Sequence, residues 1–263
     1  MTLVGKTLSA SYKDLLQVDN SNNGVTTSIK NVKDGEGTRS SLWLSDDNVL
    51  IVPQNDNATG TLTVSSQGLA DPVLECDTTN VLVKASGNIV NTQYAHFGQT
   101  NASAALVDDT HHAIPFGSNW SSSNASYPPA FGTSTDPATT FTTAEGNATR
   151  ASDLVPVMWF VPDAISIDSV TSIEGADTAT GDTTRMHLYS MTFNSGSTSA
   201  LTTGTLLAHN SDTTNAGSEQ AYKSTWTVDS AAVAANKVIL AFFKSDSINS
   251  DYSIQVTVKY HLT

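Results

Sequence analysis

The chain has 263 residues, enough for one large β domain or two smaller ones with an ample core. Charged residues make up only 14% of it, and its formal net charge is −13. So acidic a chain lacks the lysines and arginines that bind nucleic acid or an anionic membrane surface, and both classes of partner are excluded.

The first forty residues differ in charge from the rest. They carry five basic and four acidic side chains, against seven and 21 in residues 41–263. A near-neutral segment before an acidic body indicates a docking end, although ordinary fluctuation in a short segment explains it equally well. SYKDLLQV (11–18) predicts a helical turn, and GVTTSIKNV (24–32) predicts a short strand. The start MTLVGKTLSA is not that of a signal peptide, so we expect synthesis in a cytoplasm.

Residues 41–100 alternate short strands with turns. The strands are predicted at SLWLS, NVLIV, TLTVSS, PVLEC and NVLVKA. Strands this short bury too little surface within one chain. They suit a shaft in which several identical chains complete one another. Cys76, the single cysteine, is predicted to be a small buried apolar residue, and no intrachain disulfide is possible.

Residues 101–150 are rich in Ser, Thr and Asn and are predicted to form a long loop. From Gly117 to Thr149 there is no Leu, Ile, Val or Met, so this part cannot build a core of its own. Aromatic residues isolated in polar loops are typical of receptor or glycan sites, and equally of loops fixed to a neighbouring subunit. The candidates for either role are Trp120, Tyr127 and Phe131.

Residues 151–263 are predicted to form an antiparallel β-sandwich of the jelly-roll kind, with six to eight strands. VILAFF is continuously apolar, which predicts a strand covered on both faces. The closing stretch DYSIQVTVKYHLT alternates strictly from Tyr252, which predicts an internal strand with one buried face. We expect it to pair with KVILAFFK through the loop SDSINS. The stretch DSAAVAANK predicts one or two helical turns.

No motif indicates catalysis, and no catalytic, cofactor-binding or metal-binding residue is predicted. Asp108, Asp109, His111 and His112 could bind a metal. Adjacent residues on an extended chain point to opposite sides, so we expect a polar loop instead. The Asp-rich turns lack the spacing of a calcium loop, no phosphate loop or nucleophile elbow is present, and no acidic pair stands out.

Several sequence segments resemble parts of structural appendage proteins of tailed bacteriophages. They are YKDLLQVDNSNNGV, VKDGEGTRSSLWLSDDNVLI, NTQYAHFG and VILAFFKSDSINSDYSIQVTVKYHLT, and they fall in about the first and last hundred residues. The resemblance implies a homotrimer with an attachment region, a β-structured stalk and a β-sandwich head. It implies no particular functional residue.

Together these observations predict an all-β homotrimer. Its expected parts are an attachment region (1–40), a stalk (41–100), a loop segment (101–150) and a sandwich head (151–263). The expected role is that of a non-enzymatic fibre or decoration protein of the virion, bound to other virion proteins through its N-terminal region. The alternative is a β-sandwich protein that binds or degrades a host-surface glycan.

Overall fold

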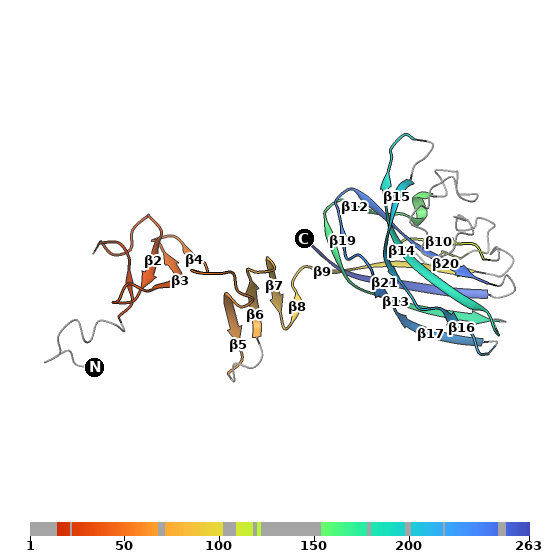
Figure 1. Ribbon diagram of the computed structural model, residues 1–263, viewed down its shortest axis with the longest axis horizontal. Helices are drawn as coiled ribbons and strands as arrows, with labels where there is room; N and C mark the ends of the chain where they lie inside the picture. The colour runs from red at the N-terminus through yellow and green to blue at the C-terminus, as the bar shows by residue number, and fades with distance from the viewer. Residues whose placement is uncertain are drawn as a thin grey trace. The chain divides into compact units, whose positions relative to one another are not determined.

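The computed structural model describes residues 15–21, 23–67, 72–101, 109–117, 120–121, 154–177, 180–197, 201–217, 219–246 and 251–263. The named elements of these residues are β-strands, apart from η2, a turn of 3-10 helix at Val155–Val157 (Figure 1). The predicted all-β class is therefore confirmed. The chain divides into two compact units, Met1–Val90 and Asn91–Thr263.

The N-terminal unit contains two antiparallel sheets of four short strands each. The first has the order β1-β2-β3-β4, with bounds Gln17–Val18, Lys30–Lys33, Arg39–Leu44 and Val49–Ile51. The second has the order β5-β6-β7-β8, with bounds Leu62–Ser65, Pro72–Asp77, Leu82–Ala85 and Asn88–Ile89. The short strands predicted for residues 41–90 are thus present, each paired with its neighbour in sequence.

Two sequence-based expectations for this unit need correction. The helical turn predicted at 11–18 is wrong where the structure describes it, because Gln17 and Val18 pair with β2. Residues 11–14 lie outside the described residues. The boundary expected after residue 40 falls inside β3, whose pairing with β2 and β4 makes residues 30–51 one sheet.

The C-terminal unit is a sandwich of two sheets. The seven-stranded sheet has the order β10-β20-β14-β15-β18, with β12 also on β20 and β16 also on β14. Their bounds are His112–Ile114, Lys237–Ser245, Thr183–Phe193, Leu201–His209, Thr227–Val228, Trp159–Val161 and Thr213–Thr214. All of these pairings are antiparallel.

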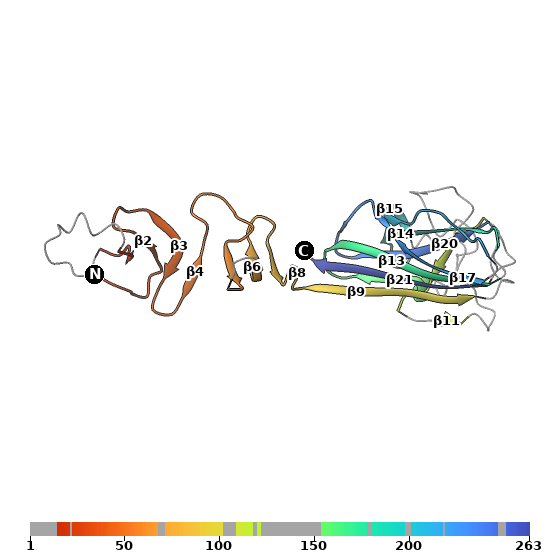
Figure 2. The same ribbon diagram turned by 90° about the horizontal axis from the view of Figure 1, so that it is seen from below.

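The six-stranded sheet has the order β11-β9-β21-β13-β17, with β19 also on β13. Their bounds are Trp120–Ser121, Thr92–Asn101, Asp251–Leu262, Ile165–Asp177, Glu219–Thr225 and Ala232–Val233. Figure 2 shows the long strands β9, β21 and β13 side by side, as their registers require. Among the described strands of this sheet, only the two-residue strand β11 pairs in parallel, with β9.

The main core lies between the two sheets. Phe97, Val256 and Val258 of the six-stranded sheet pack there with Met186 and Leu188 of the seven-stranded sheet. A second apolar cluster includes Tyr189 of β14, Leu240 and Phe242 of β20, and Val157 of η2. Along β14 and β20, the residues of this cluster alternate with residues of the main core. Strand β20 therefore has apolar cover on both faces, as VILAFF predicted.

The closing strand β21 is internal, as predicted, but its partner differs from the expected one. Tyr252, Ile254, Val256 and Val258 are almost fully buried, and β21 lies between β9 and β13. The expected hairpin with KVILAFFK is wrong, because β20 belongs to the other sheet. Strand β20 is covered on both faces and β21 on one, so the two strands suit different positions in the sandwich.

Three other expectations for this unit are corrected. DSAAVAANK forms no helix, because Ala232 and Val233 pair with β13 and Asn236 adopts a left-handed turn with φ 63°. Strand β9 belongs to the sandwich and not to a stalk ending at residue 100, since its whole length pairs with β21. Within the loop segment predicted at 101–150, His112–Ile114 forms the buried strand β10.

Candidate functional site

Of the three aromatic residues predicted to form a contact site, Trp120 is the one that the structure describes. Trp120 begins β11, where its backbone pairs with Gln99 of β9. Tyr127 and Phe131 lie outside the described residues. Their predicted role in binding a receptor, a glycan or a subunit stays a prediction.

The polar loop expected at the two adjacent histidines is wrong, because His111 and His112 are both almost fully buried and His112 begins β10. His112 pairs with Phe243, which belongs to the core between the sheets. The ring of His111 lies 5.3 Å from that of His187, measured between centroids. Asp109 lies 3.2 Å from the ammonium group of Lys244, and Asp108 is outside the described residues. Within the described part of the chain, no three His, Cys, Asp or Glu side chains are grouped so that they could hold a metal ion.

Two adjoining hollows lie on the outer face of the six-stranded sheet. One has a volume of about 250 Å³ and involves His96, Gly98, Gly117, Gln255 and Thr257, together with the neighbouring Phe97 and Val256. The other has a volume of about 310 Å³ and involves Ile173, Gly175, Ala221, Ser253 and Gln255, together with Gln99 and Ile254. Gln255 borders both hollows, so they form one surface feature.

The hollows are lined by glycines, which have no side chain, and by uncharged polar groups. A Cβ atom added at Gly175 would meet no atom within 4 Å, so this glycine leaves open space. His96 Nδ1 lies 3.2 Å from Thr257 Oγ1, and Ile173 supplies an apolar side chain that is 53% exposed. Of the described residues, none with a charged side chain lines either hollow. Such a lining suits a neutral ligand with several hydroxyl groups.

Sequence reasoning missed these hollows, although a signal was present. Gly98 and Gly175 stand inside strand patterns, in HFGQT and IEGAD. An isolated glycine within a strand often marks a close approach of another group to the backbone.

The sheet β5–β8 is the other surface of interest, because its two faces differ. On one face, two rows of apolar side chains run across strands β5, β6 and β7. One row is Leu62, Cys76 and Val83, and the other is Val64, Leu74 and Ala85. We call these six residues the Cys76 face. Leu62, Val64 and Val83 are 40%, 50% and 40% exposed. Cys76 itself is half-buried, where full burial was expected.

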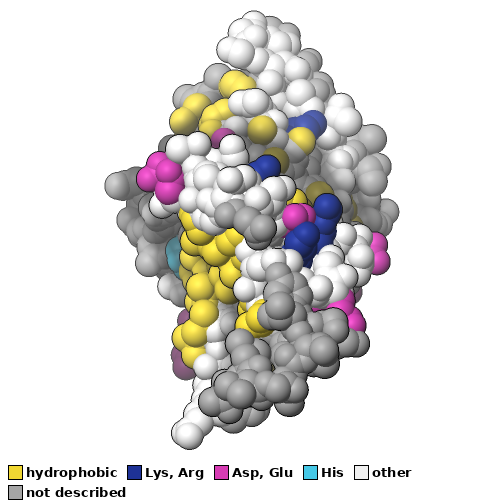
Figure 3. Space-filling view, turned by 90° about the vertical axis from the view of Figure 1, so that its left-hand side faces the viewer, with side chains coloured by type: hydrophobic (Ala, Val, Ile, Leu, Met, Phe, Trp, Pro, Cys, Tyr) yellow, Lys and Arg dark blue, Asp and Glu magenta, His cyan; other side chains and the backbone are white. Residues whose placement is uncertain are grey.

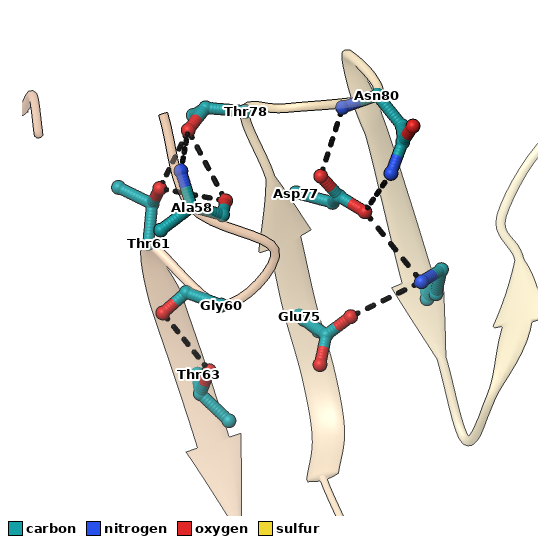
Figure 4. Close-up of polar contacts among 9 residues, drawn as sticks. Ala58, Gly60, Thr61, Thr63, Glu75, Asp77, Thr78 and Asn80 are labelled. Atoms are coloured by element: carbon teal, nitrogen blue, oxygen red, sulfur yellow. Dashed lines mark hydrogen bonds and ion pairs between the residues drawn. The ribbon is translucent and has the colours of Figure 1, made fainter. Parts of the chain in front are cut away.

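The opposite face of this sheet holds a polar network, drawn in Figure 4. Lys84 Nζ lies 3.3 Å from Glu75 Oε1 and 3.6 Å from Asp77 Oδ2. The Asp77 carboxylate also accepts hydrogen bonds from the backbone and side-chain nitrogens of Asn80, at 2.9 and 2.8 Å. These bonds hold the pKa of Asp77 below its usual value. The described charged side chains of this sheet thus lie together on this face, with Lys84 shared by the two carboxylates.

The turn after Asp77 presents a strained apolar residue. Val81 has φ 57°, a conformation that is costly for a β-branched side chain, and it is 89% exposed. The hydrogen bonds between Asp77 and Asn80 hold the turn that places it there.

No family model matches the chain, and no curated protein matches it significantly. Among the described residues, no helix has the length and apolar character needed to cross a membrane.

Proposed function

We propose that this chain is a non-enzymatic structural protein of a bacteriophage particle, in which three copies form a surface fibre or a capsid decoration. The observation that carries the proposal is that the described residues of the N-terminal unit form almost no apolar core within a single chain. Among the described residues of that unit, Val32 is the one apolar residue that is buried.

Many apolar side chains of the N-terminal unit are exposed instead. They are Leu15, Leu16, Val25, Ile29, Val49, Leu50, Val52, Leu62, Val64, Val73, Val81, Val83 and Val90. Figure 3 shows hydrophobic side chains, in yellow, open on the face of the molecule seen there. Small sheets of this kind are marginally stable in water unless another layer covers their apolar face. Further copies of the chain would provide that layer.

We assign different roles to the two units, guided by the sequence segments that resemble phage appendage proteins. The N-terminal region attaches the protein to other capsid or tail proteins. The sandwich, with its own buried core, is the head and is available for contact with the host. The protein is made in the host cytoplasm and then built into the virion.

Two measurements test this proposal. Light scattering of the purified full chain should give about 83 kDa, three times the 27.7 kDa of one chain. Quantitative mass spectrometry of purified particles should find the protein at a copy number that matches capsid or tail symmetry. A monomer at micromolar concentration, or particles without the protein, would contradict the proposal.

The hollows around Gln255 favour a second candidate function, the binding of a neutral host glycan. Their amide and hydroxyl groups can exchange hydrogen bonds with sugar hydroxyls, while Ile173 can pack against a sugar ring. Gly175→Trp should fill the larger hollow and abolish binding on a glycan array. Thr225→Trp, on the same outer face but away from the hollows, should not. Equal binding by both variants, or none by the parent protein, would exclude this function.

A further inference from the structure

We infer that the Cys76 face is the surface on which copies of this chain meet, so that the Cys76 thiols of different copies lie side by side. This inference rests on the proposed homotrimer and says which surface builds it. The face comprises Leu62, Val64, Leu74, Cys76, Val83 and Ala85.

The face has the composition of a buried surface. Its two rows cross three strands and contain no polar side chain, while Leu62, Val64 and Val83 are each at least 40% exposed. Neighbouring strands lie about 4.8 Å apart, so the six side chains form one continuous patch. On the opposite face, Lys84 pairs with both Glu75 and Asp77. Removal of the Cys76 face from water therefore desolvates no charge.

A second copy of the chain is the occupant that best suits this patch. When a surface packs against symmetry-related copies of itself, any charge near its centre meets the same charge in the other copies. The Cys76 face carries no charge, so it satisfies this condition. Its cover is also needed for the small sheet to be stable, and the partner that is always present while the chain folds is another copy of it.

Cys76 lies at the centre of the patch and provides the test. It pairs with Leu62 on one side and Val83 on the other, and the chain has no other cysteine. Packing of these faces around a symmetry axis brings the thiols together. A disulfide joins two thiols, so three chains around an axis can give one covalent dimer and one free chain.

The experiment is oxidation of the purified full-length assembly with copper phenanthroline, followed by a denaturing gel without reductant. Thiols held together react as if present at about millimolar concentration. The native assembly should therefore yield dimer and monomer bands within minutes. The same protein unfolded in urea at equal concentration should stay mainly monomeric. A native oligomer that gives no covalent dimer would overturn the inference and leave the proposed homotrimer standing. A monomer by light scattering would overturn both.

Matched variants test the face itself. Val64→Lys places a charge on the Cys76 face, and we expect the yield of covalent dimer to fall about tenfold or more, because assembly would bury that charge. Thr63→Lys changes the adjacent exposed residue, which points to the opposite face beside Glu75. It should cross-link like the parent. Equal cross-linking by both variants would show that the copies meet elsewhere.

Discussion

The Thr184 hydroxyl oxygen lies 3.0 and 2.9 Å from the two carboxylate oxygens of Glu174. Thr184 belongs to β14 and Glu174 to β13, so this contact joins the two sheets of the sandwich. Glu174 is only 1% exposed. Burial raises the pKa of Glu174 from 4.5 to about 7, although the hydrogen bond from Thr184 opposes that rise.

The first prediction is that Glu174 makes the sandwich less stable as the pH rises. Between pH 4.5 and about 7 the folded protein holds a proton on Glu174 that the unfolded chain releases. The stabilisation that the folded state gains from this bound proton is therefore fully present below pH 4.5 and is lost as the pH rises through 7. Each unit of pKa difference corresponds to about 1.4 kcal/mol, which gives roughly 3 kcal/mol in all. Glu174→Gln removes the titration and should exceed the parent in stability at pH 8.

The measurement is the urea midpoint of parent and Glu174→Gln at fixed protein concentration from pH 5 to pH 8. The advantage of the variant should be small at pH 5 and grow toward pH 8. Glu219→Gln, at an exposed glutamate of the same sandwich, should show no such growth. A constant difference between parent and Glu174→Gln across this range would refute the prediction.

The second prediction concerns the two faces of β21. Val256 is fully buried between Phe97 of β9 and Ser172 of β13. Val256→Asp would bury an unpaired charge at a cost of several kcal/mol and should give insoluble protein. Thr257→Asp falls beside His96 on the outer face and should change stability by about 0.5 kcal/mol or less. Soluble yield and thermal unfolding provide the comparison, and equal tolerance of the two changes would mean that β21 is not internal.

The third prediction concerns a buried hydrogen bond between Ser172 of β13 and Trp226, which lies between β17 and β18. The indole nitrogen of Trp226 donates to Ser172 Oγ at 2.9 Å, and both residues are buried. Ser172→Ala leaves the indole N–H without this acceptor and should reduce the free energy of unfolding by about 1–3 kcal/mol. Ser253→Ala, on the exposed face of β21, serves as control. A Ser172→Ala protein as stable as the control would show that the bond contributes little.

The fourth prediction is that residues 91–263 fold without the N-terminal unit. This fragment contains both sheets of the sandwich and its buried core. It should be soluble and show a cooperative thermal transition, but it should fail to join particles. A fragment starting at residue 102 is the control, because it lacks β9 and would expose one edge of β21. A disordered 91–263 fragment would contradict the division into two units.

The sequence predicted those elements whose side-chain pattern has one interpretation. Strict alternation in β21 and the continuous apolar run in β20 led to the correct burial of both strands. Strand pairing was less predictable, because a period-two pattern says which face is buried but not which neighbour lies beside it. The hairpin expected between β20 and β21 followed from their proximity in sequence. Their different burial, on two faces and on one, was the evidence against it.

The helix expected at DSAAVAANK failed for a related reason. Alanine favours helices only weakly, and pairing of Ala232 and Val233 with β13 outweighs that preference. The hollows beside Gly98 and Gly175 and the Thr184–Glu174 contact depend on which strands lie together. Alternation along β13 could have placed Glu174 on the inner face between Ser172 and Ala176, but not its partner from the other sheet.

The position of β21 between β9 and β13 also dictates when the sandwich can form. His96 and Thr257, which pair across β9 and β21, are 161 residues apart. At a usual rate of translation, roughly 10 to 30 seconds separate their exit from the ribosome. Until residues 251–262 are synthesised, β9 and β13 each lack their longest partner and expose an open edge. The six-stranded sheet can therefore form only after β21 has been synthesised. During that interval the nascent chain stays soluble only if its aggregation is slow or if chaperones cover the open strand edges.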